Sequence, residues 1–370
     1  MTTTYVKELL ARSAETDFLS VDEALNLYYH APLPALMNSA NMLRNSMNTP
    51  GNVTWIVDRN VNITNICQVQ CLFCNFCTKK GSSNAYTLTL NDYHERIETL
   101  FREGGNQLLL QGGLNPELGL RFYTHLFASL KDKYPNLKLH ALGPPEIVFL
   151  SKKEGIGIAD TLKILIEAGL DSLPGAGAEI LSDRVRKQLS PAKCSVDEWL
   201  EVMRQAHKIG ITTTATMMFG HIETIEERIQ HLYLIRELQN EKPPQSMGFI
   251  AFIPWPCSFN NTRLLKHYPD LKPISASEYV RFISLSRIFL RNIQHIQASW
   301  LTVGTEVGAL CLHAGADDLG SVMIEENVVK STGLENTLIA AQMKQLIRQN
   351  GFIPVQRDQN YNAVAVTTEN

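Results

Sequence analysis

The sequence lacks several features that would assign it to a membrane, a secretory route or a nucleic acid. No run of about 18 apolar residues exists, so we expect no transmembrane helix. The first residues, Met1-Thr-Thr-Thr-Tyr-Val-Lys7, hold no apolar signal core. The formal net charge is only −3, which gives no basic footprint for nucleic acid. We therefore expect a cytoplasmic protein that binds neither membrane nor nucleic acid.

Cysteine is also scarce, and its distribution argues against a secreted disulfide framework. Seven cysteines are an odd number, and most of them lie between residues 67 and 77. The others, Cys194, Cys257 and Cys311, are isolated, so no second ligand pair completes a zinc finger. This use of cysteine agrees with a reducing compartment.

The clustered cysteines form one short stretch, Cys67-Gln-Val-Gln-Cys71-Leu-Phe-Cys74. Three thiolates at this spacing can hold three irons of a [4Fe–4S] cluster and leave the fourth iron without a protein ligand. An open metal position can bind a substrate or a cofactor. Cys77 adds a fourth thiol, so a closed tetrahedral zinc site is the alternative. If the stretch holds a cluster, Cys77 is a neighbour and not a ligand.

The remaining pattern predicts an α/β fold. Residues 1–47 are helical in pattern, with a capping box at Ser20-Val-Asp-Glu23. Short apolar runs then alternate with amphipathic stretches, which favours a parallel sheet covered by helices. The predicted strands are 60–66, 107–111, 137–142, 170–173, 211–218, 247–253, 296–301 and 318–323. The predicted helices are 91–103, 118–132, 159–168, 195–209, 224–240, 277–293, 305–313 and 336–349.

Eight such units predict a TIM-type (βα)8 barrel, with an incomplete six-stranded barrel as the alternative. We expect residues 1–50 to form an N-terminal helical cap and residues 51–355 to form the barrel. Residues 356–370 are expected to be a polar, frayed C-terminal tail. Active sites of such barrels lie at the C-terminal ends of the strands.

Several candidate site residues follow predicted strands. Gln111-Gly112-Gly113 lets backbone approach a ligand closely, although a plain turn explains it equally well. His140 can bind substrate or move a proton near neutral pH, or it is a bonded core histidine. Pro144 and Pro145 begin a helix that has Glu146 in its first turn.

The next strand ends carry carboxylates. A glycine-containing loop ends at Glu179, which can accept hydrogen bonds from two ribose hydroxyl groups or cap a helix. Arg184 and Arg186 follow at a spacing that cannot share one helix face. The stretch Thr216-Met-Met-Phe-Gly-His-Ile-Glu223 comes next, and Phe252-Ile-Pro-Trp255 suits a pocket around a planar ring. The last two strands lead to residues 299–302 and 317–321.

The cysteine spacing, with an aromatic residue before the last cysteine, resembles the signature of radical S-adenosylmethionine (SAM) enzymes. The order of the other motifs is similar to the dehypoxanthine futalosine cyclases of the futalosine route to menaquinone. The resemblance covers residues 50–330 and depends most on Phe252-Ile-Pro-Trp255 and on Gly320-Ser-Val-Met-Ile-Glu-Glu-Asn327. Three positions depart from the pattern: Cys77, Ala176 and Cys257.

The resemblance implies a [4Fe–4S] cluster, SAM and a set of site residues. The implied metal ligands are Cys67, Cys71 and Cys74. The implied cofactor-binding residues are Phe73, Gln111, Gly112, Gly113, Glu179, Arg186, Met218 and Gly220. The implied candidates for a catalytic base are His140, His221 and Glu223, and Arg59 or Arg263 is expected to bind a carboxylate.

The resemblance also implies a reaction. A 5′-deoxyadenosyl radical removes hydrogen from C4′ of the ribose of dehypoxanthine futalosine, a small nucleoside-like substrate. The ribose radical adds to the attached benzoate ring, and loss of an electron and a proton gives cyclic dehypoxanthinyl futalosine. The implied partner is a reductant such as flavodoxin or ferredoxin. An aminofutalosine synthase, a deazaflavin-synthase-like enzyme and a zinc-binding scaffold are the alternatives.

Overall fold

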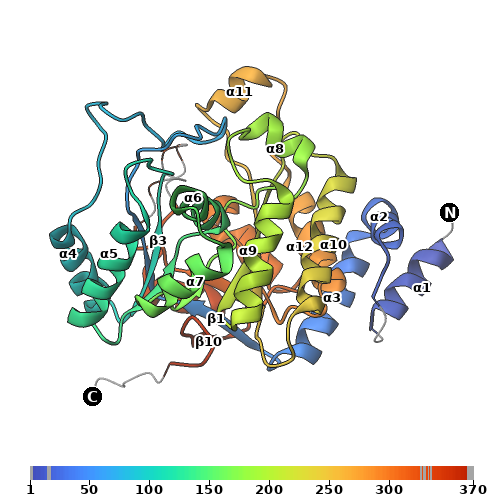
Figure 1. Cartoon of the computed structure of the whole chain (residues 1–370). Coiled ribbons are helices and arrows are strands. Elements are labelled where there is room, and N and C mark those ends of the chain that lie inside the picture. The colour runs from blue at the N-terminus through green and yellow to red at the C-terminus, as the bar shows by residue number, and fades with distance from the viewer. Residues whose placement is uncertain are drawn as a thin grey trace, which may run out of the picture.

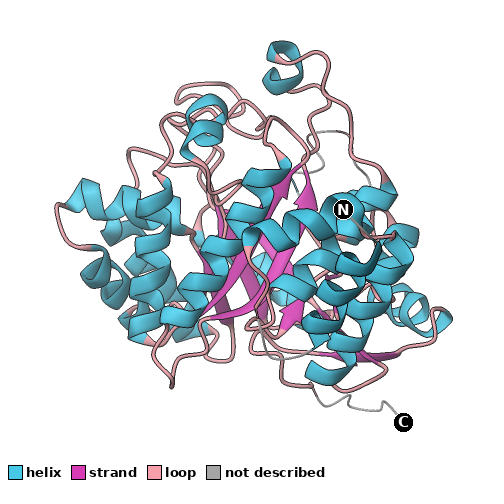
Figure 2. Ribbon diagram, turned by 90° about the vertical axis from the view of Figure 1, so that its right-hand side faces the viewer, coloured by secondary structure: helices cyan, strands magenta, loops and turns pink. Residues whose placement is uncertain are grey.

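The computed structural model describes residues 3–14, 18–325, 327, 331, 333 and 336–364. Parallel strands form an inner layer, and helices surround them (Figure 2). The cysteine loop, α8 and α11 lie at one end of the molecule, and β1 and β10 lie at the other (Figure 1). In the described part of the chain, no helix is long and apolar enough to cross a membrane.

The main sheet has seven parallel strands in the order of the chain. They are β2 (Asp58–Asn62), β3 (Gln107–Gln111), β4 (Lys138–Ala141), β5 (Ser172–Leu173), β6 (Thr212–Phe219), β7 (Phe249–Pro256) and β8 (His295–Ile296). A second sheet has the order β10 (Ile353–Gln356), β1 (Asn52–Ile56) and β9 (Asp318–Ser321). The predicted strand at 318–323 is therefore β9, which pairs with β1.

The small sheet links the two edges of the main sheet. β1 runs into β2 with Val57 between them, and a parallel bridge joins Gln297, just after β8, to Asp318 of β9. The strands thus curl into an α/β barrel, as the sequence predicted, and the six-stranded alternative is wrong. The sequence pattern missed β1 and β10.

The helices follow the predicted alternation. Around the strands lie α4 (Leu90–Arg102), α5 (Leu120–Lys133), α6 (Pro144–Glu154), α7 (Ile158–Glu167), α8 (Asp183–Leu189), α9 (Val196–Ile209), α10 (Ile225–Glu241), α11 (Arg263–His267), α12 (Ala276–Phe289), α13 (Trp300–Val303), α14 (Thr305–Cys311) and α16 (Ala340–Gln349). At the N-terminus, α1 (Thr3–Ala14), α2 (Val21–His30) and α3 (Leu33–Met47) pack beside α10 and α12 (Figure 1). They cover outer helices and not an end of the barrel.

Local sequence explains where several helices begin. Ser20, Ser195 and Thr224 each accept a hydrogen bond from the third helical residue, whose glutamate bonds back to the cap. At Ser275 only the first half of this capping box forms. β3 shows the alternation of a strand, since Leu108 and Leu110 are buried under helices while Leu109 and Gln111 are half-buried on the other face.

The C-terminal segment closes the end of the barrel opposite the cysteine loop. Arg357 donates to both carboxylate oxygens of Asp318, at 2.6 and 3.1 Å. Tyr361 stacks on His295, with ring centroids 3.8 Å apart. Ser172 donates to Gln359 at 3.2 Å. The part of the predicted tail at 356–364 is therefore packed and not frayed, while residues 365–370 lie outside the described residues.

This closure corrects the expectation that Asp317 and Asp318 face the reaction. Asp317 pairs with Arg287 at 2.6 Å and with His295 at 2.5 Å. Asp317 and Asp318 lie at the start of β9 and not at its end. Strand starts and strand ends occupy opposite faces of a parallel barrel. Both aspartates therefore stabilise the closed end.

The ion pair between Arg357 and Asp318 gives a stability prediction. Arg357→Met leaves the fully buried Asp318 without its cation, which is expected to lower the free energy of unfolding by about 3–5 kcal/mol. Urea unfolding followed by circular dichroism measures this change. Arg348→Met, at an exposed position of α16, is the control and is expected to change little. Equal effects of the two variants would contradict the prediction.

Candidate active site

The cysteine loop is held by backbone hydrogen bonds to distant segments. Cys67 N–H donates to Thr78 O at 3.1 Å, and Leu72 N–H donates to Leu189 O at 2.8 Å. Arg263 donates to the carbonyl oxygens of Gln70 and Cys71. Arg263, which the sequence offered for a substrate carboxylate, therefore clamps the loop.

Gly113 allows the end of β3 to lie directly against the start of this loop. A Cβ atom there would lie 2.2 Å from Ile66 O and 2.8 Å from Cys67 Cβ, which no side chain tolerates. Gly113 N–H donates to Thr64 O at 2.8 Å, and Leu114 N–H donates to Cys67 Sγ at 3.4 Å. The glycine pair thus sets the position of the first thiol. Gln111 and Gly112 lie beside it, and the Gly112 backbone acts to lower the pKa of the Glu146 carboxyl.

The thiols of the loop have different environments. Burial raises the pKa of Cys71 to about 11. Hydrogen bonds from Cys77 and from the backbone lower the pKa of Cys74 to about 6. The neighbouring Cys74 thiol and burial raise the pKa of Cys77, whose S–H donates to Cys74 O at 3.7 Å.

Three of these thiols fit a [4Fe–4S] cluster by chemistry and setting. Among the described residues, no group of three or more His, Cys, Asp or Glu side chains is arranged for a single metal ion. In a cluster each thiolate binds a different iron, so the sulfur atoms stand further apart than around one ion. Cys67 and Cys74 pack with Cys71, Phe73 and the surrounding apolar residues. N–H donors on Cys67 and Cys74 suit thiolate ligands.

Glu179 and Lys193 form a buried ion pair next to this loop. Burial alone would raise the pKa of Glu179, but Lys193 and Arg186 hold it below its usual value. Lys193 Nζ lies 5.6 Å from the centroid of the Phe73 ring. The sequence pointed to Glu179 and Phe73 and missed Lys193, because a lysine after Ser190-Pro-Ala carries no local signal of a buried partner.

Arg186 donates its hydrogen bonds to backbone carbonyl groups of the protein. Its guanidinium donates to the carbonyl oxygens of Gly177, Ala178 and Cys194 at 2.5–2.9 Å, and the residue is only 4% exposed. It therefore shapes the loop that carries Glu179. Arg184 pairs with Glu227 at 2.5 Å. Neither arginine is left to bind a ligand carboxylate, contrary to the expectation for Arg186.

His221 and Glu223 lie in a closed network at the end of β6. Glu223 accepts from the N–H groups of Gly220 and His221 and pairs with Arg228 at 2.7 Å. Burial opposes ionisation, yet His221, Arg228 and Gly220 lower the pKa of Glu223 to about 2. His221 Nε2 lies 3.0 Å from Met218 O. Both side chains are fully buried and paired, so neither is open to a substrate proton.

His140 lies inside the barrel, on the strand face where β4 and β5 pair. Its Nδ1 lies 2.7 Å from Ser172 Oγ. Burial and the charge of Arg357 lower the pKa of His140 to about 4, which keeps the imidazole neutral at pH 7. Glu146 is also buried, and burial raises its pKa to about 7. His140 and Glu146 thus favour their uncharged forms, whereas Glu223 is held ionised by its partners.

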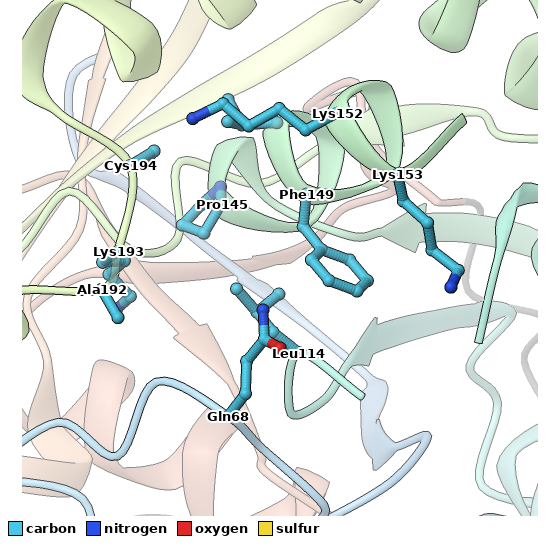
Figure 3. A pocket seen from close by; sticks show the side chains of 10 residues that line it. Gln68, Leu114, Pro145, Phe149, Lys152, Lys153, Ala192, Lys193 and Cys194 are labelled. Atoms are coloured by element: carbon cyan, nitrogen blue, oxygen red, sulfur yellow. The ribbon is translucent and has the colours of Figure 1, made fainter. Parts of the chain in front are cut away.

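A cavity of about 340 Å³ opens beside the cysteine loop. Gln68 and Leu114 face Pro145 and Phe149 of α6, and Lys193 closes another side (Figure 3).

Met218, buried at the end of β6, donates its N–H to Glu179 O at 3.0 Å. Gly220 follows with φ +84°, where a Cβ atom would lie 2.8 Å from Ile274. Cys257 is buried, and burial raises its pKa.

The pair of Lys193 and Glu179 predicts a pH-dependent stability difference. In Lys193→Met, Glu179 is buried without a cation, which is expected to cost about 3 kcal/mol at neutral pH. The native pair stabilises the fold above the pKa of an unfolded glutamate, about 4.3, and this contribution is lost as the pH falls. The difference from the native chain should therefore shrink toward about pH 4.5.

Urea unfolding at several pH values measures this difference. Lys187→Met is the control, because Lys187 is exposed on α8. A deficit that stays constant with pH would show that Glu179 is not the group left unpaired.

Two family descriptions match most of the chain between them. "Radical SAM superfamily" matches residues 61–235, and "CofH/MqnC C-terminal region" matches residues 246–369. The solved structure of methylornithine synthase has a TM-score of 0.72 and 19% identity, and the match covers 94% of this chain and 97% of that chain. This likeness shows the fold.

Curated relatives narrow the family. A Streptomyces coelicolor protein named cyclic dehypoxanthine futalosine synthase is 39% identical over 364 residues, which are 98% of this chain and 89% of that protein. An Archaeoglobus fulgidus protein named 5-amino-6-(D-ribitylamino)uracil–L-tyrosine 4-hydroxyphenyl transferase is 38% identical over 313 residues, which are 84% and 88% of the two chains. The chain therefore belongs to the radical SAM enzymes, in the family with a CofH/MqnC C-terminal region that includes the cyclic dehypoxanthine futalosine synthases.

Proposed function

We propose that this protein cyclises dehypoxanthine futalosine to cyclic dehypoxanthinyl futalosine in menaquinone biosynthesis. The observation that carries the proposal is similarity over 98% of the chain to a relative of that name. Transferase relatives are 33–38% identical over 84–98% of the chain, so the preference for the cyclase rests on the identity of 39% over 98% of the chain. The site supports the proposal, since its thiols, buried ion pair and cavity suit a cluster and SAM.

The proposed cluster ligands are Cys67, Cys71 and Cys74. When bound, the cluster and SAM supply the 5′-deoxyadenosyl radical that removes hydrogen from the substrate ribose. Gly112 and Gly113 fix the loop at the cluster, and Phe73 packs against it. Val69, Leu114 and Phe149 give these thiols an apolar setting.

We assign the remaining cofactor contacts to the groups next to the thiols. Lys193 takes the role of binding the SAM carboxylate that the sequence gave to Arg186, because its charge lies near Cys71 and its side chain lines the cavity beside the loop. Glu179 is placed to accept hydrogen bonds from the ribose once Lys193 turns to the carboxylate. Met218 and Gly220 form the wall beside Glu179.

His140 is the proposed base for the final proton. It is neutral at pH 7, so Nε2 can accept a proton when Nδ1–H bonds to Ser172. Ser172 then acts as a positioning residue. A neutral base inside a polar barrel is favoured over Glu223, whose carboxylate is already bonded to three groups.

Cysteine variants test the ligand assignment. Cys67→Ala, Cys71→Ala and Cys74→Ala are each expected to lose the iron and sulfide that the reconstituted protein binds, because a cubane with a single open iron needs all three thiolates. Iron and sulfide analysis with the visible absorption spectrum measures this loss. Cys77→Ala is the matched control and is expected to keep the cluster. Loss of the cluster in Cys77→Ala would instead favour a site with four protein thiolates.

The activity is tested anaerobically with SAM, dithionite and dehypoxanthine futalosine. Formation of 5′-deoxyadenosine together with a product lighter by two hydrogen atoms is expected. If 5′-deoxyadenosine forms slowly and the substrate is recovered unchanged, the substrate assignment is wrong. The same protein would then be tested with L-tyrosine and 5-amino-6-(D-ribitylamino)uracil, the compounds in the name of the transferase relative.

A further inference from the structure

A second cavity, of about 490 Å³, lies at the barrel mouth beside the cysteine loop. Its described lining consists of Asn62, Phe76, Tyr86, Leu88, Arg96, Glu325 and Asn327. Asn62 is the last residue of β2 and pairs in register with Gln111. Phe76 precedes Cys77 in the cysteine loop. The cavity therefore opens at the same face as the candidate active site.

Two guanidinium groups share one carboxylate oxygen at this cavity. Arg59 Nε lies 2.8 Å from Glu325 Oε2, and Arg96 Nε lies 3.3 Å from the same atom. The side chains are only 17–24% exposed. Among the described acids, Asp92 also lies near Arg96, and its carboxylate caps α4 at Thr89. Arg59 and Arg96 thus share the Glu325 carboxylate as their ion-pair partner in a half-buried setting, and a further anion can pair with the guanidiniums there.

Several donors of this cluster are free in the part of the chain that the structure describes. Arg59 Nη1 donates to Arg96 O at 3.2 Å, and Arg96 Nη1 donates to Asp92 O at 2.9 Å. No bond from Nη2 of either arginine is present among the described residues. Glu325 Oε1 accepts from Asn327, which also bonds to Asn62. Glu325 is therefore held in place and orients both guanidiniums.

Part of the cavity lining is aromatic and apolar. Phe76 and Tyr86 form an edge-to-face pair with centroids 6.3 Å apart, and Leu88 lies beside them. Aromatic and apolar lining together with the guanidinium of Arg96 fits a ring that bears a carboxylate. A hydrated inorganic anion would gain nothing from these rings.

We propose that the cavity binds an aromatic carboxylate through Arg96, with Arg59 behind it and with Glu325 as the ion-pair partner that the ligand carboxylate replaces at Arg96. This inference rests on the proposed function, in which the aromatic carboxylate is the benzoate group of the substrate. The site would hold the benzoate ring at the mouth of the barrel, near the cysteine loop. Arg59 was one of two candidates from the sequence; Arg96 and Glu325 were not.

Binding of benzoate and of benzamide, its neutral counterpart, tests the site without turnover. Isothermal titration of the anaerobically reconstituted protein is expected to give binding of benzoate about tenfold tighter than that of benzamide. Arg96→Gln is expected to abolish this preference. Arg102→Gln, at an exposed position on the same helix, is the control and keeps the preference.

Glu325→Gln separates a binding role from a purely structural one. It breaks the ion pairs but keeps both guanidiniums, so benzoate should bind at least as tightly as to the native chain. Loss of binding in Glu325→Gln as large as in Arg96→Gln would overturn the proposal. So would an unchanged benzoate preference in Arg96→Gln.

This carboxylate site rests on the proposed function. Measurements of turnover distinguish a failure of the site from a failure of the function. If dehypoxanthine futalosine is cyclised and Arg96→Gln leaves KM unchanged, the site is wrong and the function stands. If benzoate binds as predicted but no cyclised product forms, the function is wrong and the carboxylate site stands. A rise in KM of about tenfold, with kcat changed less, supports both.

Discussion

The close approach of two strand ends governs the candidate site. A Cβ atom at Gly113 would lie 2.2 Å from Ile66 O, so only glycine lets the segment after β3 meet the segment after β2. This contact brings Leu114 N–H to Cys67 Sγ and Gly112 N–H to Glu146. The cysteine loop then reaches across to Leu189 and Leu264. A short glycine pair therefore fixes the position of the thiols, the adjacent cavity and a buried carboxyl.

Buried charges fall into two groups according to how many of their donors or acceptors are already used. Arg186, Glu223 and Arg357 have bonds on nearly every polar atom, so they hold the fold and have no capacity for a ligand. Lys193 and Arg96 each meet one carboxylate at the edge of a cavity. Exchange of that carboxylate for one on a ligand would keep the charge paired. The number of unused donors and acceptors therefore distinguishes candidate binding groups from structural groups better than the residue type does.

The C-terminal region is part of the barrel and not an appended domain. Strands β7 to β10 lie within residues 246–369, so the segment that matches the CofH/MqnC description supplies strands of both sheets. Arg357 and Tyr361 close one end, while Glu325 and Asn327 reach the opposite mouth. One segment therefore contributes residues to both ends of the barrel.

The sequence by itself determined what depends on neighbours along the chain. Three features could be predicted from the sequence alone. They are the spacing of the thiols that begins at Cys67, the capping boxes at Ser20, Ser195 and Thr224, and the alternation of strands and helices. Glu179 and the glycine pair were found because their loops follow apolar runs. Only the tertiary structure decided which charges meet. Lys193 beside Glu179, Arg96 beside Glu325 and Asp318 beside Arg357 depend on contacts between distant segments, and no local pattern encodes them. The same reason explains why Arg186, a predicted cofactor contact, and Glu223, a candidate base, are bonded within the fold instead.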